Sequence, residues 1–132
     1  CLSKLYSNLM NNVSAKERIA IELNLPKDNY LKSWLMAFNT IRNIVAHHSR
    51  IWNRNIDLPP KSLHKTPHPF IEIPANVFSI YHTISCMVFV LNKIDASHDI
   101  KDKIKRLLAS CPKVNVAEMG FPANWEEQPL WK

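Results

Sequence analysis

Apolar residues recur at intervals of three and four through most of the chain, the spacing that places them on one face of an α-helix. The first set lies within residues 2–10 and consists of Leu2, Leu5, Tyr6, Leu9 and Met10. Residues 14–17 read as a capping box, in which the side chains of Ser14 and Glu17 satisfy free N–H groups at a helix start. We expect the helix that follows to stop near Pro26, because proline cannot continue it.

Three further helices are predicted. The first follows Asp28, a good N-cap residue, and is expected to run to about His48. Its apolar face consists of Tyr30, Leu31, Trp34, Leu35, Phe38, Ile41 and Val45. Another helix is expected from about Asn76 to about Lys93, and the last is capped by Ser97 and ended by the proline at position 112.

A proline-rich stretch separates these helices. Five prolines fall within sixteen residues, at Pro59, Pro60, Pro67, Pro69 and Pro74. They forbid a continuous helix, so the stretch is either an irregular connection wrapped over the helices or a functional flap. The pattern predicts an all-α fold: one helical domain over residues 1–132 with a proline-rich irregular connection.

Composition agrees with a single folded domain. The chain has 132 residues, 46% of them hydrophobic, which is enough for one core. One glycine in the whole chain argues against an all-β protein with glycine-rich turns. The longest apolar run, residues 77–91, is shorter than the ~20 residues that cross a bilayer. We therefore expect a buried helix there and no membrane association.

Cysteine usage and charge narrow the setting. Cys1, Cys86 and Cys111 are odd in number and widely spaced, which suits neither a disulfide framework nor a zinc site, so a cytoplasmic location is expected. Seventeen basic residues against eleven acidic ones give a net charge of +6. This excess suits a polyanionic partner.

The candidate chemistry lies in residues 38–54, FNTIRNIVAHHSRIWNR. On a helical wheel Asn43 and His47 stand one turn apart, opposite the apolar face, with Arg42 on the flank. Arg50 and Arg54 extend this stripe if the helix continues. No Asp or Glu occurs from residue 29 to residue 56. Such a face is suited to bind an anion, and a merely solvated helix face is the simplest alternative.

This string carries a family resemblance. Residues 42–47 have the form R-N-x3-H, which resembles the R-x4-6-H motif of HEPN domains. The longer string RNIVAHHSRIWNR resembles the Abi (abortive infection) family of bacterial HEPN proteins. The ending, with Gly120-Phe121-Pro122, Trp125 and Trp131, is also similar to that family. We expect the resemblance to cover about residues 30–132, with this chain as the C-terminal portion of a longer protein.

The resemblance implies a fold, an activity and partners. HEPN domains are all-α bundles that usually dimerise and bring two motifs into one cleft. Many are metal-independent ribonucleases of toxin–antitoxin and phage-defence systems. The implied partners are an RNA substrate, a second copy of the chain, and an antitoxin that is RNA or protein. No cofactor and no metal are expected.

The resemblance also assigns roles to residues. It places Arg42, Asn43 and His47 at the catalytic positions. It places His48, Arg50, Asn53 and Arg54 in an extension that we interpret as RNA-binding. Ser49 stands where the toxins neutralised by a nucleotidyltransferase carry tyrosine, so modification of that kind is not expected.

The residue types fit RNA cleavage on chemical grounds. RNA carries its own nucleophile, the 2′-hydroxyl, so an enzyme needs proton transfer, which histidine performs, and charge stabilisation, which arginine performs. One histidine leaves the opposite acid–base role open, and a symmetric dimer supplies it. Two alternatives remain: a non-catalytic module that binds RNA or a protein, and a purely structural helical domain.

Four other features have simpler interpretations. His64 and His68 are separated by Pro67, so a shared metal site is not expected. His82 lies in an apolar segment and is interpreted as a core histidine. Trp52 either stacks on a base or packs into the core. Its position on the core side of the helical wheel favours packing. A basic group on the last helix, Lys101, Lys103, Lys105 and Arg106, is interpreted as a solvated face rather than an RNA contact.

Overall fold

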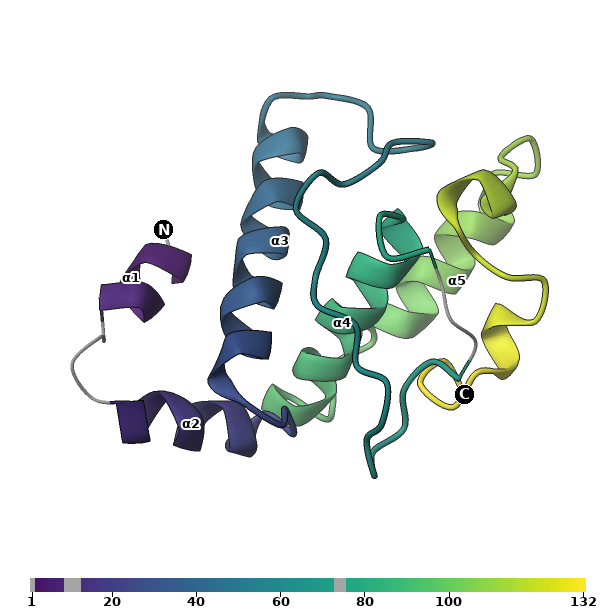
Figure 1. Ribbon diagram of the computed structural model, residues 1–132. Helices are drawn as coiled ribbons and strands as arrows, with labels where there is room; N and C mark the ends of the chain where they lie inside the picture. Colours follow the sequence, from purple (N-terminus) through teal and green to yellow (C-terminus); the bar gives the residue numbers. More distant parts are fainter. Residues whose placement is uncertain (1, 9–12, 73–75) are drawn as a thin grey trace.

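The computed structural model describes residues 2–8, 13–72 and 76–132 (Figure 1). Over these ranges the chain forms helices and no strand, which confirms the all-α prediction. The elements are α1 (Leu2–Asn8), α2 (Val13–Glu22), α3 (Asp28–Ala46), α4 (Ile80–Ile94), α5 (Ile100–Ser110) and the short 3-10 helices η1 (Val116–Met119) and η2 (Trp125–Glu127). Leu9, Met10 and Pro74 lie outside the described residues.

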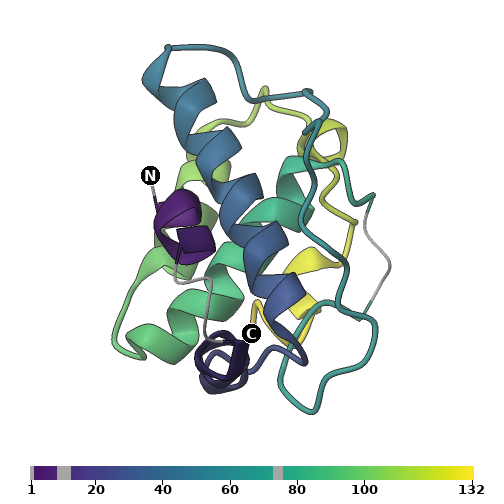
Figure 2. The ribbon, with the colours of Figure 1, turned by 60° about the vertical axis from the view of Figure 1, so that its left-hand side comes forward.

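The helix α3 is the centre of the fold. Helices α1, α2 and α4 pack against it, and Figures 1 and 2 show them arranged around its length. Its buried residues, Leu31, Trp34, Ala37 and Ile41, recur every three or four positions, as a helix with one inward face requires. The described helices include none that is long and apolar enough to cross a membrane.

Aromatic rings fill the core on both sides of α4. The Trp34 ring packs edge-on against Phe89 at 5.8 Å between centroids and stacks on Phe70 at 6.2 Å. On the other side the C-terminal segment contributes Trp131, which stacks on Tyr81 at 6.1 Å. Helix α4 is buried on most of its surface for this reason, as the apolar run predicted.

Several helix starts differ from the sequence prediction. Helix α2 begins at Val13, so Ser14 already has helical backbone and is not the predicted N-cap, which requires a non-helical one. Helix α3 begins at Asp28 itself, one residue earlier than predicted. Helix α4 begins at Ile80, where the Ser79 hydroxyl accepts a hydrogen bond from the His82 N–H at 3.2 Å.

The last long helix also begins later than predicted. Helix α5 starts at Ile100 with Asp99, not Ser97, at the N-cap. The Ser97 hydroxyl is engaged elsewhere, since it donates to the Asp95 carboxylate at 2.6 Å. The predicted end at Cys111 is confirmed.

Helix α2 ends in a left-handed residue. Asn24 has φ 62°, its N–H donates to the Ile21 carbonyl, and the Leu25 N–H donates to the Ala20 carbonyl, both at 2.9 Å. This hydrogen-bond pattern is a Schellman motif, in which asparagine replaces the usual glycine. The helix therefore ends before Pro26 rather than because of it.

The proline-rich connection from α3 to α4 is attached to both helices at one point. The Trp34 Nε1–H donates to the Lys61 carbonyl at 2.8 Å, and the Lys61 N–H donates to the Ser33 hydroxyl at 3.0 Å. One residue earlier, the Pro60 carbonyl lies 3.1 Å from His82 Nε2. The connection is irregular, as predicted, and runs over the helices in both ribbon views (Figures 1 and 2).

The C-terminal segment closes the core over α4. Phe121, Trp125, Leu130 and Trp131 are buried, and the Trp131 Nε1–H donates to the Ser85 hydroxyl at 3.3 Å. Gly120 has φ 86°, and a Cβ there would overlap the side chain of Ser79. Glycine is therefore required where this segment crosses the start of α4.

Candidate functional site

The three predicted catalytic residues lie together at the C-terminal end of α3. Arg42 and Asn43 occupy its final turns, and His47 is the C-cap residue. All three side chains are exposed. The His47 N–H donates to the Asn43 carbonyl at 3.1 Å, which confirms the predicted spacing of one helical turn.

A side-chain hydrogen bond fixes the first two of these residues. Arg42 Nη1 donates to Asn43 Oδ1 at 3.1 Å. A guanidinium has five N–H donors, so this contact leaves most of them for an anion. It also holds the Asn43 amide beside the arginine.

Helix α3 does not continue beyond the motif. His48 has φ 52°, its N–H donates to the Val45 carbonyl at 2.9 Å, and the Ser49 N–H donates to the Ile44 carbonyl at 3.0 Å. This second Schellman motif reverses the chain. The helix therefore ends at Ala46 rather than at about His48. The condition under which Arg50 and Arg54 would extend the helical stripe, a continued helix, is not met.

A small apolar cluster lies beneath this end of α3. Its buried members are Ile41, Ile56 and Ile80, with Ile44, Ile51, Ile84, Met87 and Met119 packed against them. We call it the isoleucine cluster. Ile44 turns toward it, whereas Val45 remains 52% exposed, so the prediction that Val45 lies on the core face is wrong.

The isoleucine cluster holds the next stretch of chain at the same end of the molecule as the motif. Ile51 and Ile56 both pack into it, and the four residues between them, Trp52, Asn53, Arg54 and Asn55, are all exposed. We call residues 52–55 the tip. The tip brings two of the predicted RNA-binding residues, Asn53 and Arg54, to the end of the molecule that carries the motif.

Trp52 is not a core side chain. It leaves 36% of its surface exposed, while the other three tryptophans are buried. The wheel favoured packing because it treated residue 52 as helical, and the helix has ended six residues earlier. Sequence reasoning also missed Asn55. The sequence feature that could have indicated the exposure of both residues is a short stretch, residues 52–55, between two isoleucines that pack into the same cluster.

The arginines at this end of the protein make no ion pair among the described residues. Arg42, Arg50 and Arg54 are exposed, and none of them forms an ion pair with a carboxylate among the residues that the structure describes. By contrast, Lys103 on α5 lies 2.8 Å from Asp99 and Lys105 lies 4.0 Å from Glu126. The interpretation of α5 as a solvated face fits these contacts, while the end of α3 is suited to an anion.

His82 is a structural histidine, as predicted. Its ring is buried, Nε2 contacts the Pro60 carbonyl, and Nδ1 has no hydrogen-bond partner among the described residues. Burial lowers the pKa of His82 below its usual value, the Pro60 carbonyl opposes this shift, and His64 adds to it. The neutral ring thus joins the connection to α4.

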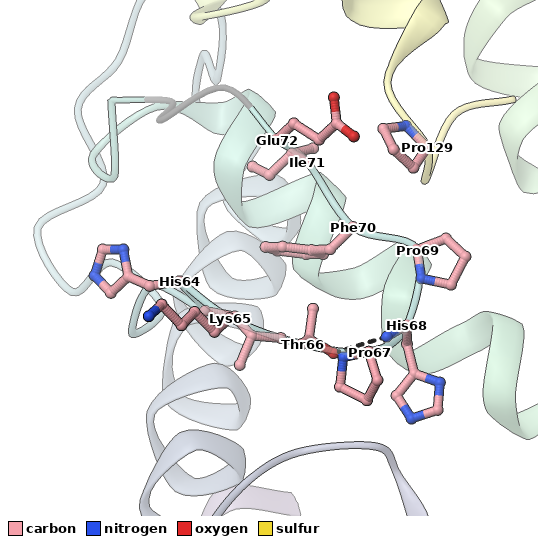
Figure 3. A pocket seen from close by; sticks show the side chains of 11 residues that line it. His64, Lys65, Thr66, Pro67, His68, Pro69, Phe70, Ile71, Glu72 and Pro129 are labelled. Atoms are coloured by element: carbon pink, nitrogen blue, oxygen red, sulfur yellow. Dashed lines mark hydrogen bonds between the residues drawn. The ribbon is translucent and has the colours of Figure 1, made fainter.

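A sizeable pocket lies elsewhere on the protein. It has a volume of 610 Å³ and is lined by residues 63–72 of the connection and by Pro129 (Figure 3). His64 and His68 stand at its opposite ends, with Lys65, Thr66 and Pro67 between them. Within the described ranges, no group of three or more metal-ligating side chains occurs.

The same loop touches the far end of α3. Residues 65–68 line a second pocket together with Leu25 and Pro26, which lie just before α3 begins. A helix of 19 residues is about 28 Å long. The pocket loop is therefore remote from the motif and contributes nothing to it.

The site and the fold together define an all-α protein with an exposed, acid-free arginine–histidine pair at a helix end. Residues 1–53 match the family of Abi-like proteins. The match includes α1, α2, α3 and the chain as far as Asn53, and it supports the resemblance to the Abi family. It does not extend over the expected range of residues 30–132, and the C-terminal segment lies outside it. No curated protein and no solved structure matches the chain.

Proposed function

We propose that this protein is a metal-independent endoribonuclease of the HEPN type that acts in bacterial phage defence by abortive infection. The observation that carries the proposal is the joint exposure of Arg42, Asn43 and His47 at one helix end, without an acidic partner. The similarity of residues 1–53 to Abi-like proteins supports the biological setting.

The proposed reaction uses the nucleophile that RNA itself contains. His47 takes the proton from a ribose 2′-hydroxyl, whose oxygen attacks the adjacent phosphorus. The bond from phosphorus to the 5′-oxygen of the next nucleotide breaks, and that oxygen receives a proton. The products are a 2′,3′-cyclic phosphate and a free 5′-hydroxyl, and no redox partner is needed.

Arg42 and Asn43 act on the charge that builds up on phosphorus. The Arg42 guanidinium donates to the non-bridging oxygens, and its hydrogen bond to Asn43 Oδ1 limits its motion before substrate arrives. The Asn43 amide N–H groups add a second donor to the same phosphate. Metal-dependent nucleases stabilise this charge with metal ions that carboxylates hold, and the sequence from residue 29 to residue 56 has no carboxylate side chain.

The second acid–base group comes from a second copy of the chain in this proposal. In a two-fold dimer each surface meets itself, so two exposed motif ends bring two His47 rings into one cleft. One ring then acts as the base while the other acts as the acid. Light scattering should show a dimer, and a monomer at high protein concentration would contradict this part of the proposal.

A binding module without catalysis is the second candidate. The observation that favours it is that no described side chain makes a hydrogen bond to the His47 ring, whereas a catalytic base is usually oriented by a third group. Such a module would use the same arginines to dock RNA or a protein. Cleavage itself separates the two functions.

The decisive experiment measures RNA cleavage in EDTA and identifies the new ends. The parent protein should cleave, leave a 2′,3′-cyclic phosphate, and spare a strand with 2′-deoxyribose at the scissile position. His47→Ala should lower the rate by about 10²–10⁴-fold. His68→Ala, which removes an equally exposed imidazole remote from the motif, should keep the parent rate. Cleavage of the deoxy strand, or full activity of His47→Ala, would contradict the mechanism; RNA binding without cleavage would favour the binding module.

A further inference from the structure

The tip exposes the indole ring of Trp52, and exposed arginines precede and follow it in the sequence at positions 50 and 54. We propose that Trp52 stacks on an unpaired base and makes this end of the protein selective for single-stranded RNA. The proposal rests on the proposed function and names its substrate class. It assigns Trp52 to substrate binding rather than to catalysis.

The tip lies at the same end of the molecule as the motif. Ile41 and Ile44 of α3 pack into the isoleucine cluster. In the sequence they flank the two motif residues Arg42 and Asn43. Ile51 and Ile56 enter the same cluster from either side of the tip. Because one packed cluster holds all four side chains, the tip and the motif are fixed at the same end of the molecule.

The backbone of the tip is anchored to the rest of the fold. Ile56 is fully buried, and its N–H donates to the Phe78 carbonyl at 2.8 Å, which ties the end of the tip to the turn before α4. Asn53 has φ 51°, so a tight left-handed turn lies within the tip. A tip anchored at both ends presents its indole at little cost in conformational entropy.

The side chains in and beside the tip are of the kinds that bind single-stranded nucleic acid. Trp52 leaves 36% of its surface exposed, and an exposed arginine lies two positions away in the sequence on either side, Arg50 and Arg54. A single-stranded nucleic acid uses both kinds of group, since its bases stack on aromatic rings and its phosphates bind arginine. No acidic residue from 29 to 56 repels those phosphates.

The same chemistry separates single strands from duplexes. In an RNA double helix the bases already stack on one another, and none is free to cover an indole. A duplex would therefore meet the arginines at this end but not Trp52. The contribution of Trp52 should appear with unpaired RNA alone.

The test measures binding in a His47→Ala background, so that the RNA stays intact. Trp52→Leu should weaken binding of single-stranded RNA by about 5-fold to 150-fold, the range that base–aromatic stacking provides. Trp52→Phe should keep most of the affinity. Leu58→Ala, which shortens another exposed apolar residue of the connection, should bind as the parent does. Binding of a duplex of the same sequence should not change in any variant.

Intrinsic fluorescence gives a second measurement on the same samples. Trp34, Trp125 and Trp131 are buried, so quenching by added single-stranded RNA should come from Trp52 and vanish in Trp52→Phe. Unchanged affinity in Trp52→Leu, or an equal loss with the duplex, would overturn the stacking proposal. Absence of any RNA binding would overturn it too. Stacking by a protein that does not cleave would leave this proposal standing and refute the nuclease.

Discussion

The two halves of α3 have the same alternation of apolar and polar residues but different surroundings. In the first half, Leu31, Trp34 and Ala37 are buried, and Trp34 is enclosed by three phenylalanine rings and hydrogen-bonded to the connection. In the second half Ile41 is the sole buried residue, and Arg42 and Asn43 face outward. Packing from neighbours, not the helix itself, decides which half serves stability and which is free to bind.

The largest test of this contrast compares Trp34 with Arg42. Trp34→Ala should lower the free energy of unfolding by about 3–5 kcal/mol, because it leaves a large cavity. Trp34→Phe should lower the free energy of unfolding by less than Trp34→Ala does. Arg42→Ala should stay within about 0.5 kcal/mol of the parent, as an exposed substitution does. Urea denaturation measures all three, and equal losses from the two alanine variants would erase the distinction.

The buried region should also respond to pH. Because burial lowers the pKa of His82, the unfolded chain binds a proton at a higher pH than the folded protein does. Its contribution to stability is full above the ordinary imidazole pKa of about 6.5 and is lost as the pH falls toward the lower folded value. The free energy of unfolding should decrease by up to ~1.4 kcal/mol per pH unit in that window.

The matched variant for this test is His82→Gln. Its amide still donates to the Pro60 carbonyl but takes up no proton, so unfolding curves measured below about pH 6.5 should show a weaker pH dependence than the parent. The same slope in both proteins would show that protonation of His82 does not loosen the attachment of the connection.

The smallest effect concerns the backbone at the end of α3. A left-handed conformation costs a side chain such as histidine about 1–2 kcal/mol, and glycine avoids it at some entropic cost in the unfolded state. His48→Gly should therefore raise stability by about 0.5–1 kcal/mol, measured by thermal unfolding. Asn24→Gly is the equivalent change at the end of α2. It should raise stability by less than His48→Gly does, because asparagine tolerates the left-handed conformation. A loss of stability in His48→Gly would mean that the imidazole itself stabilises the fold.

The sequence predicted the helices well and their boundaries less well. The apolar face was predicted to contain Trp34, Phe38, Ile41 and Val45, a spacing that is compatible with a helix. Phe38 packs against the core as predicted, Ala37 is buried as well, and Ile44 rather than Val45 turns inward at the end of the helix. A tertiary partner for each side chain is needed to decide between such neighbours.

The candidate site shows a similar division. The spacing of Asn43 and His47 and their exposure could be read from the helical wheel, since they depend on local geometry alone. The end of α3 could not, because His48 adopts a conformation that sequence rules associate with glycine or asparagine. The place of the tip depended on Ile51 and Ile56 meeting Ile41 and Ile80, a long-range contact that no local pattern contains.

The position of Trp131 has a consequence for how the protein is made. Its ring is fully buried against Tyr81, and its indole N–H reaches Ser85, some fifty positions back in the chain. During translation α4 therefore emerges with an uncovered apolar face and keeps it until the ribosome has added Trp131. Contacts so far apart in sequence form late, and an incomplete chain exposes the surface that aggregates or recruits chaperones.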